Sequence, residues 1–181
     1  MATWRGTAGV LRAIKEPFSI ESVEMLPVAP GRVIVKTHAS PFCSTDVKNW
    51  KGLLYKIPPT ILGHASFGEV VEIGEGVTGV SVGQRVVVPG TPECGTCYYC
   101  THGLYNICEN LAFTGLMNNG AFAELVNVPA NLLYKLPANF PPEAGALIEP
   151  LAVGMHAVKK AGSLLGKNVV VVGAGTIGLC T

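Results

Sequence analysis

Short apolar runs rich in β-branched residues, separated by glycine and proline, make up most of the first 140 positions of the chain. Some runs alternate apolar and polar residues, as a half-buried strand does, and others are continuous, as in a strand buried on both faces. The frequent turn residues predict an irregular, mainly β architecture. The expected strands cover residues 3–11, 19–25, 32–39, 68–74, 83–88, 121–128 and 132–136.

Helical patterns are short and occur in two regions. The polar residues at 44–46 are all suited to cap a helix, and they predict a short helix that ends near residue 51. A second helical region starts at residues 141–143, is interrupted at Pro150 and continues as a helix that ends at Gly162. Proline is tolerated in a first helical turn and glycine ends helices well, so the chain is expected to be mainly β with some α.

A glycine fingerprint stands close to the end of the chain. The apolar run at 168–172 predicts a strand of a parallel sheet that is buried on both faces. Gly173, Gly175 and Gly178 follow it directly in the pattern G-x-G-x2-G. After a strand, such glycines allow a tight turn, close approach of a pyrophosphate and close packing of a helix. A glycine-rich turn without a ligand is the alternative.

Four of the six cysteines lie in one polar loop with the spacing C-x2-C-x2-C-x7-C. They are Cys94, Cys97, Cys100 and Cys108. Four thiolates this close in sequence can surround one tetrahedral Zn²⁺, and a site closed by four ligands from one loop is structural, not catalytic. Two disulfides and four unrelated thiols are the alternatives, but neighbouring C-x2-C pairs form strained bridges. We therefore predict a structural zinc lobe near residues 90–112.

The composition predicts an ordered protein with a well-buried core, because 49% of the residues are hydrophobic and only 14% are charged. Lys plus Arg number 13 and Asp plus Glu 12, and no basic run occurs, so nothing favours nucleic-acid binding. The first residues lack the apolar segment of a signal peptide, and no apolar run is long enough to cross a membrane. Zinc-bound thiolates fit a reducing compartment, so a cytoplasmic location is expected.

Three further residues could carry chemistry, although their spacing alone does not bring them together. Cys43 follows a predicted strand, His64 lies in a glycine-flanked stretch, and Glu149 interrupts an apolar helix. A buried glutamate is costly unless it is paired or bound to a metal. From the residues alone, an exposed cysteine, a turn histidine and an exposed glutamate form an equal alternative. Cys180 has apolar neighbours and is expected to be a core thiol.

Four motifs follow one another in a recognisable order: Cys43-Ser44-Thr45-Asp46, Gly63-His64-x3-Gly68, the four-cysteine loop and the terminal glycine fingerprint. Together they resemble the zinc-dependent medium-chain alcohol and polyol dehydrogenases over essentially the whole chain. Residues 149–157 are similar to the sorbitol and threonine dehydrogenase branch in particular. The resemblance implies a GroES-like, partly open β-barrel catalytic domain at residues 1–150. At residues 151–181 it implies a linking helix, then the first strand and glycine turn of an incomplete Rossmann domain.

The resemblance also implies roles for individual residues. Cys43, His64 and Glu149 would hold a catalytic zinc with an open fourth position, in addition to the structural zinc. The metal would lower the pKa of a bound alcohol so that an alkoxide forms near neutral pH, and a hydride would pass to NAD or NADP. Thr45 would relay the hydroxyl proton, and Asp46 would orient a zinc ligand. The three glycines of the fingerprint would contact the cofactor.

Two positions depart from the family pattern. Ala65 follows the histidine ligand, at a position where many relatives carry glutamate. By the resemblance, Glu149 is then the only acidic candidate for a zinc ligand. Lys48 stands where many alcohol dehydrogenases have a proton-relay histidine, and a lysine could contact phosphate or solvent instead. His102, inside the cysteine loop, is expected at the surface. His156, seven residues after Glu149, is expected to pack or hydrogen-bond near the site.

The favoured function is the N-terminal portion of a zinc-dependent, NAD(P)-dependent alcohol or polyol dehydrogenase with a small alcohol or polyol as substrate. Family members are commonly dimers or tetramers, which suggests a homo-oligomer for the full-length protein. We expect the chain to be a fragment that is inactive alone, because it holds one strand of a nucleotide-binding fold that needs about six. The alternatives are a non-catalytic GroES-like zinc module that holds a partner or subunit interface, and a redox switch built on the cysteine loop.

Overall fold

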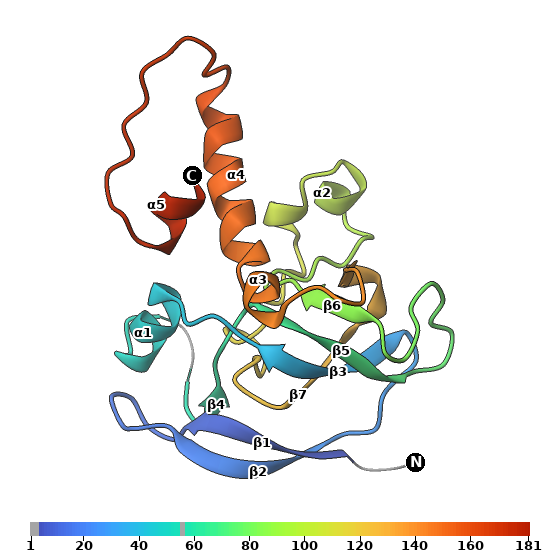
Figure 1. The fold of residues 1–181 in the computed structure, drawn as a ribbon. Helices are drawn as coiled ribbons and strands as arrows, with labels where there is room; N and C mark the ends of the chain where they lie inside the picture. Colours follow the sequence, from blue (N-terminus) through green and yellow to red (C-terminus); the bar gives the residue numbers. More distant parts are fainter. Residues whose placement is uncertain (1–3, 55–56) are drawn as a thin grey trace.

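The computed structural model describes residues 4–54 and 57–181, and two antiparallel sheets form its body (Figure 1). The smaller sheet has the strand order β2-β1-β4. Its long pair β1–β2 is in continuous register from Trp4 opposite Met25 to Val10 opposite Ser19. The strands of this sheet are β1 (Trp4–Leu11), β2 (Ser19–Met25) and β4 (Thr60–Ile61).

The larger sheet has the strand order β7-β3-β5-β6-β8. Its central strand pair, β3 and β5, shifts register between Ile34 and Val35 and again between Thr37 and Ala39. Such shifts increase the local twist, which helps an open sheet to curl. The strands are β3 (Arg32–Ala39), β5 (Ser66–Ile73), β6 (Arg85–Val88), β7 (Leu125–Pro129) and β8 (Tyr134–Lys135).

The main core lies on the larger sheet and is built largely from valine. Val33, Val35, Val70 and Val86 are completely buried, as the β-branched runs of the sequence predict. The two sheets meet along the segment before β7, where Ala123 bridges to Ala8 of β1. No continuous ladder joins them in the described ranges, which gives the partly open barrel that was expected.

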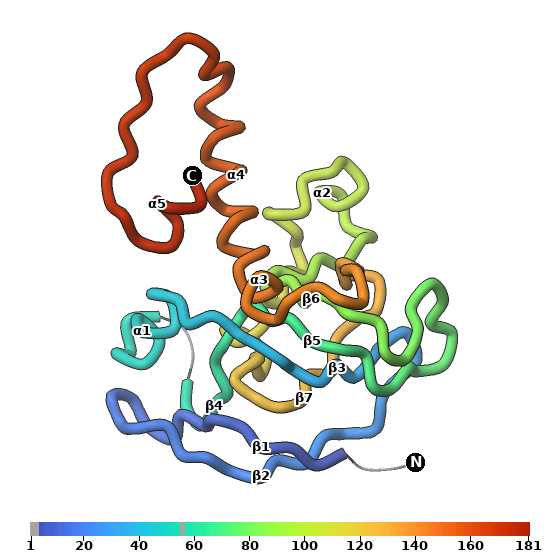
Figure 2. The backbone as a smooth tube through the Cα atoms, viewed as in Figure 1, coloured from blue at the N-terminus to red at the C-terminus, as the bar shows by residue number. Residues whose placement is uncertain are grey.

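The helices lie at the edges of this β body. Helix α4 projects from it, and the chain then follows a wide arc back to α5, which lies beside α4 (Figures 1 and 2). This close packing requires a glycine, since a Cβ at Gly154 would lie 2.4 Å from the carbonyl oxygen of Cys180. The α-helices are α1 (Ser44–Trp50), α2 (Tyr98–Thr101), α3 (Pro142–Ala146), α4 (Ile148–Ala161) and α5 (Thr176–Cys180). The 3₁₀ turns are η1 (Tyr105–Ile107) and η2 (Ala130–Leu132).

Most predicted elements are present, with shorter ends in places. The strand predicted at 3–11 is observed as β1, and Thr3 lies outside the described residues. The strand predicted at 121–128 is reduced to β7, and the one predicted at 132–136 is largely replaced by η2 and the two-residue β8. The second helix begins at Ile148, so that Pro150 lies in its first turn, and it ends at Gly162 as predicted.

The strand predicted at 168–172 is not observed. This segment has no assigned strand and pairs with no other, and Val170 and Val172 are 85% and 95% exposed. A strand is defined by its backbone hydrogen bonds to neighbouring strands. Among the described residues, no strand pairs with this segment. The prediction of a strand buried on both faces is therefore wrong for this segment, because an apolar pattern does not produce a strand where no neighbouring strand is present to pair with it. Among the described residues no helix is long and apolar enough to span a membrane.

Candidate metal centres

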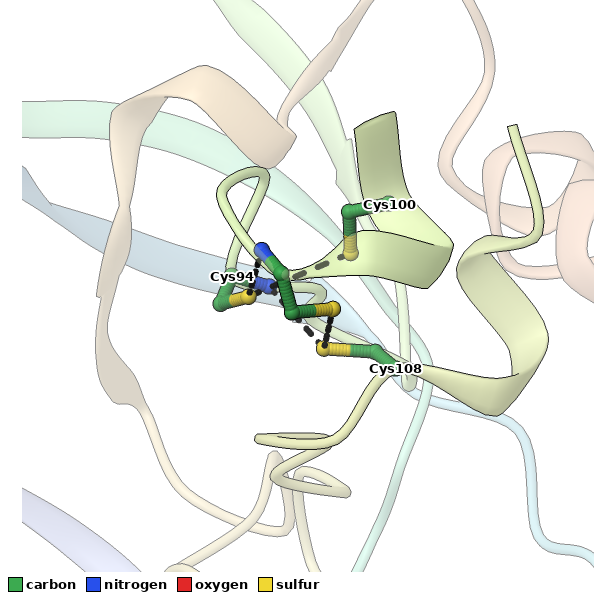
Figure 3. Close-up of side chains that lie close together, drawn as sticks. Cys94, Cys100 and Cys108 are labelled. Carbon is green, nitrogen blue, oxygen red and sulfur yellow. Dashed lines mark hydrogen bonds between the residues drawn. The ribbon is translucent and has the colours of Figure 1, made fainter. Parts of the chain in front are cut away.

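The four cysteines predicted as zinc ligands converge in one lobe beside α2 and η1. All four Sγ atoms lie within 4.8 Å of one another (Figure 3). The separations are 4.0 Å from Cys94 to Cys100 and 3.9 Å from Cys97 to Cys108. Four sulfurs placed about 2.3 Å from one tetrahedral Zn²⁺ would be about 3.8 Å apart, whereas a disulfide requires about 2.05 Å. The lobe therefore has the geometry of a metal site, and its cysteines are not paired as disulfides.

Backbone N–H groups turn toward these sulfurs. Cys108 Sγ accepts hydrogen bonds from the N–H groups of Cys94 at 3.4 Å and Asn110 at 3.3 Å, and Cys94 Sγ accepts one from Cys97 N–H at 3.3 Å. Donors of this kind stabilise thiolate, the form in which cysteine binds a metal. The donor set thus fits a Zn²⁺ ion held by four thiolates, with every ligand position filled by protein.

The thiols of the lobe differ in their acidity. The N–H and hydroxyl of Thr96, together with the N–H of Cys97, lower the pKa of Cys94 to about 5. Burial raises the pKa of Cys100 to about 12. In the metal-free lobe Cys94 is therefore the thiolate that an incoming cation would meet at neutral pH.

The second predicted site starts at the N-terminus of α1. Cys43 is the N-cap of this helix, and its Sγ accepts a hydrogen bond from Thr45 N–H at 3.5 Å. In return, the carboxylate of Asp46 accepts one from Cys43 N–H at 2.9 Å, which completes a capping box. Burial acts to raise the pKa of the Cys43 thiol, but the donors of Thr45 and the charge of His64 outweigh it, so this pKa lies below its usual value.

Asp46 connects this helix to the segment that carries His64. Its side chain is completely buried, and its other carboxylate oxygen accepts a hydrogen bond from Gly63 N–H at 3.2 Å. The same oxygen lies 3.6 Å from His64 Nδ1, an ion-pair distance when the ring is protonated. The Asp46 carboxylate raises the pKa of His64 against the opposite effect of burial, and the charges of Cys43 and Glu149 contribute in the same direction.

Glu149 reaches this region through the packing of α3 on β5. A Cβ on Gly145 of α3 would lie 2.4 Å from the ring of Phe67, which is completely buried in β5. Only glycine permits so close a contact, and α4 begins immediately after α3. Glu149 stands in the first turn of α4 and is half-buried. Its charge contributes to the raised pKa of His64.

The described residues gather only one close group of three or more metal-ligating side chains, and that group is the four-cysteine lobe. Cys43, His64 and Glu149 occupy one region without converging to ligand distance. The buried His64 Nδ1 has no hydrogen-bond partner within the usual distance, which leaves this nitrogen oriented by Asp46 alone. This donor set of one thiol, one imidazole and one carboxylate fits a zinc site with an open position.

Some of the residues around Cys43 and His64 lie where the sequence predicted them, and others do not. Thr45 is half-buried beside the Cys43 sulfur, whereas Lys48 is exposed in the last turn of α1. Ala65 is buried and offers no side-chain donor. The expectation that His156 packs near the site is wrong, since its side chain is exposed. Seven residues along a helix place it about 10 Å from Glu149.

Two smaller expectations can also be compared with the structure. His102 lies at the surface as predicted, where its ring stacks on Tyr98 with centroids 4.2 Å apart. Cys180 is half-buried, so the prediction of a core thiol is wrong. It lies in α5, which packs against α4 on one side only (Figure 1).

The glycine fingerprint forms a sharp turn ahead of α5. Gly173 has φ 105°, a conformation that favours glycine, and Gly175 is the N-cap of α5. A Cβ on Gly178 would lie 1.9 Å from the carbonyl oxygen of Gly173, so only glycine fits at that position. The turn and the close helix packing that these glycines allow are thus both present, although the preceding strand is not.

Residues 29–138 match the family described as the alcohol dehydrogenase GroES-like domain, and this match covers more than half of the chain. The chain belongs to this family. An L-threonine 3-dehydrogenase from Pyrococcus furiosus is 41% identical over 162 residues, which are 87% of this chain and 46% of that protein. A 2-dehydro-3-deoxy-L-galactonate 5-dehydrogenase from Pseudoalteromonas atlantica is 41% identical over 165 residues, which are 88% of this chain and 48% of that protein.

A solved structure supports the same conclusion. A protein described as a zinc-binding dehydrogenase from Sinorhizobium meliloti, bound to NADP, superimposes with a TM-score of 0.90 at 34% identity. The match covers 98% of this chain and 52% of that one. The comparisons confirm the GroES-like fold and the zinc-dependent medium-chain dehydrogenase lineage expected from the sequence. The chain spans about half the length of the curated relatives it matches.

Proposed function

We propose that this chain forms the metal-binding part of a zinc-dependent dehydrogenase that transfers a hydride between a secondary alcohol and NAD or NADP. The observation that carries the proposal is the double role of Asp46. Its buried carboxylate accepts hydrogen bonds from the Cys43 and Gly63 N–H groups, and so ties together two segments that each bring one metal-ligating side chain. A module with a structural role alone would gain nothing from this arrangement.

Cys43, His64 and Glu149 would hold the catalytic metal, and the four cysteines of the lobe would hold a second, structural zinc. When bound in the first site, zinc supplies a Lewis acid that makes an alcohol hydroxyl easier to deprotonate. Asp46 keeps the imidazole of His64 in a fixed orientation and leaves its other nitrogen for the metal. The complete burial of Asp46 strengthens its electrostatic contact with His64.

Thr45 is the residue that would accept the proton of the substrate hydroxyl. It lies two positions after Cys43, in the first turn of α1, and it is only half-buried, so its side chain can exchange a proton with solvent-facing groups. Lys48 is one turn further along the same helix and is exposed. It provides a positive charge at the outer end of this path, suited to a phosphate of the cofactor or to solvent.

The glycine turn at the start of α5 would receive the pyrophosphate of the nucleotide. The S. meliloti structure with this fold is bound to NADP, which supports a nicotinamide cofactor here. Both named relatives act, by their names, on a hydroxyl at an inner carbon of a small polar molecule, at carbon 3 of threonine and carbon 5 of a sugar acid. We therefore propose a secondary alcohol within a small, polar, polyfunctional substrate.

Metal analysis of the purified chain tests this function. We expect two zinc ions per chain, of which Cys43→Ser loses one and Cys97→Ser loses the other. The same zinc content in Cys43→Ser as in the parent would contradict a metal site at Cys43. Ala65, and the absence of convergence of the three side chains to ligand distance, favour a second candidate, a non-catalytic zinc module. That candidate predicts one zinc per chain, which Cys43→Ser retains.

A further inference from the structure

Asn49 is a buried polar residue to which the proposed function assigns no role. It lies on α1, three residues after Asp46, and its side chain is 1% exposed. Residues three apart on a helix share one face, so both side chains point into the protein. The two oxygens of Asp46 accept hydrogen bonds, whereas neither Nδ2 nor Oδ1 of Asn49 makes one within the described part of the chain. Buried polar groups are almost always hydrogen-bonded, so this carboxamide calls for a partner.

Thr60 has the same property on the segment that leads to His64. It belongs to β4 and is 2% exposed, and among the described residues its hydroxyl has no hydrogen-bond partner. The next residue, Ile61, packs with Ala8 and Val10 in the small core on one face of the smaller sheet. Successive side chains of a strand point to opposite faces, so the Thr60 hydroxyl lies on the other face of this sheet.

Helix α1 is attached at both of its ends to segments that flank Thr60. Near its beginning, Asp46 accepts a hydrogen bond from Gly63 N–H at 3.2 Å, and Gly63 lies three residues after Thr60. At its end, Trp50 binds the loop that follows β1. Its carbonyl oxygen accepts an N–H of that loop at 2.8 Å, and its Nε1 donates to a carbonyl oxygen there at 2.8 Å. Leu11, the last residue of β1, is buried and pairs with Thr60. The buried face of α1 therefore covers the pair of Leu11 and Thr60.

We propose that Asn49 is a positioning residue for the Cys43 region, and that it acts through one internal water molecule that it holds together with Thr60. Asn49 stands between Asp46 and Trp50 on the buried face of α1, so its carboxamide faces the Thr60 hydroxyl. The carboxamide offers donors and an acceptor, and the hydroxyl offers one donor and two lone pairs, so a single water can bond to both groups. Buried waters typically make about three hydrogen bonds, to polar groups that otherwise lack a partner.

This water gives α1 a second attachment to the segment that carries His64, one helical turn away from the attachment made by Asp46. Cys43 caps α1, and His64 lies four residues after Thr60. With the Asp46 contacts alone, the helix could pivot about one side chain, whereas two attachments also fix the direction of its axis. The relative placement of the two ligand-bearing segments then depends on both. The positioning role rests on the proposed metal site, but the water site itself does not.

Nuclear Overhauser contacts between water and the side-chain NH₂ protons of Asn49, measured by NMR on the intact chain, test the water site directly. We expect cross-peaks with the sign of a long-lived, bound water. They should disappear in Thr60→Val, which removes the hydroxyl but keeps the branched shape, and persist in Thr60→Ser, which keeps the hydroxyl. Thr78→Val, at an exposed threonine, is the control and should leave them unchanged. If the parent chain shows no such cross-peaks, or if they persist in Thr60→Val, the shared water site is contradicted.

Zinc competition with a chelator tests the positioning role. We expect Asn49→Leu and Thr60→Val each to weaken zinc binding at the Cys43 region roughly 10-fold, with the zinc of the lobe unaffected. The double variant should weaken it no further, because both changes remove the same water. Thr60→Ser should bind zinc as the parent does.

Three outcomes would overturn the positioning role. They are unchanged affinity in both single variants, losses that multiply in the double variant, and an equal loss of zinc from the lobe, which would indicate a general effect on folding. If the parent chain binds no zinc at Cys43, the proposed function fails and the positioning role fails with it. The NMR result then still decides whether Asn49 and Thr60 share a water.

Discussion

The carboxylate of Asp46 lies 3.6 Å from Nδ1 of His64 and is completely buried. Asp46 is the chain's only aspartate, and its two oxygens accept hydrogen bonds from Cys43 N–H and Gly63 N–H. One side chain thus fixes the helix that begins at Cys43 and the turn that precedes His64. The relative placement of the two predicted metal ligands depends on it.

Asp46→Asn should weaken metal binding at the Cys43 region by about 10- to 100-fold, because an outer carboxylate that orients a histidine ligand has an effect of this size. The amide also turns an N–H₂ toward one of two backbone N–H groups, which leaves a buried donor unsatisfied and costs about 1–3 kcal/mol. Zinc competition with a chromophoric chelator measures the first effect, and denaturant unfolding measures the second. Glu16→Gln, at an exposed carboxylate, is the control. If the zinc affinity of Asp46→Asn is unchanged, the hypothesis that Asp46 positions the metal ligands is contradicted.

Cys43→Ser and Cys97→Ser should separate the two metal sites by their effect on stability. Serine is itself a good N-cap, so α1 keeps its cap in Cys43→Ser, and we expect Tm to change by less than about 2 °C. Cys97→Ser removes one of four ligands of the lobe, and we expect Tm to fall by roughly 5–10 °C, or about 2–3 kcal/mol. Differential scanning calorimetry measures the Tm of both variants, and zinc analysis of the same samples shows which metal each variant has lost. Equal losses of Tm in the two variants would contradict the division into a structural and a catalytic site.

Local patterns were sufficient to predict the long strands. The bounds predicted for β2 and β3 agree with those observed, since alternation and β-branched runs report directly on a pleated, half-buried or buried strand. The two-residue strand β4 was missed because its pairing with Val10 and Leu11 leaves no pattern of its own. The run at 168–172 shows the opposite error, in which a strong strand pattern lacks a neighbouring strand to pair with.

The four-cysteine lobe could be predicted from spacing alone, because all its ligands lie close together in the sequence. Cys43 and His64 could be joined only through resemblance, since their proximity depends on Asp46 and on the packing of separate segments. The contact between Arg32 and Asn127 had no sequence signal at all, because it joins residues 95 positions apart across two paired strands. Contacts of this kind follow from sheet register, which a local pattern does not specify.

The zinc-free lobe should show selective thiol chemistry at mildly acidic pH. The pKa of Cys94 is lowered to about 5 by the N–H and hydroxyl of Thr96, so at pH 6 this residue is mostly thiolate. The pKa of Cys100 is raised to about 12 by burial, so this residue stays a thiol. Iodoacetamide at pH 6, followed by peptide mass spectrometry, should therefore modify Cys94 well before Cys100. Comparable rates at the two positions would refute this assignment.

The lowered pKa of Cys94 also makes the stability of the metal-free lobe depend on pH. The folded-state pKa of Cys94 lies below its ordinary value, so its thiolate stabilises the metal-free lobe above the unfolded-state pKa. That contribution is lost progressively as pH falls through about 5. Thr96→Ala removes one of the donors and should move the onset of Cys94 alkylation to higher pH. Thr101→Ala, at a lobe threonine whose hydroxyl bonds to backbone carbonyls instead, is the matched control.

Gly145→Ala should destabilise the chain and loosen the placement of Glu149, even though alanine is the better helix former. The intrinsic preference for alanine within a helix is worth about 1 kcal/mol, whereas overpacking a filled core costs about 1–3 kcal/mol. A Cβ on Gly145 would lie 2.4 Å from the ring of Phe67, and that ring is completely buried, so α3 must shift away from β5. We expect a net loss of up to about 2 kcal/mol in unfolding experiments, and weaker zinc binding at the Cys43 region with the lobe unaffected. Gly175→Ala is the control, since a Cβ there meets nothing within 4 Å and φ is −79°. A Tm that rises in Gly145→Ala would show that the helix preference dominates and that the contact with Phe67 does not hold α3 in place.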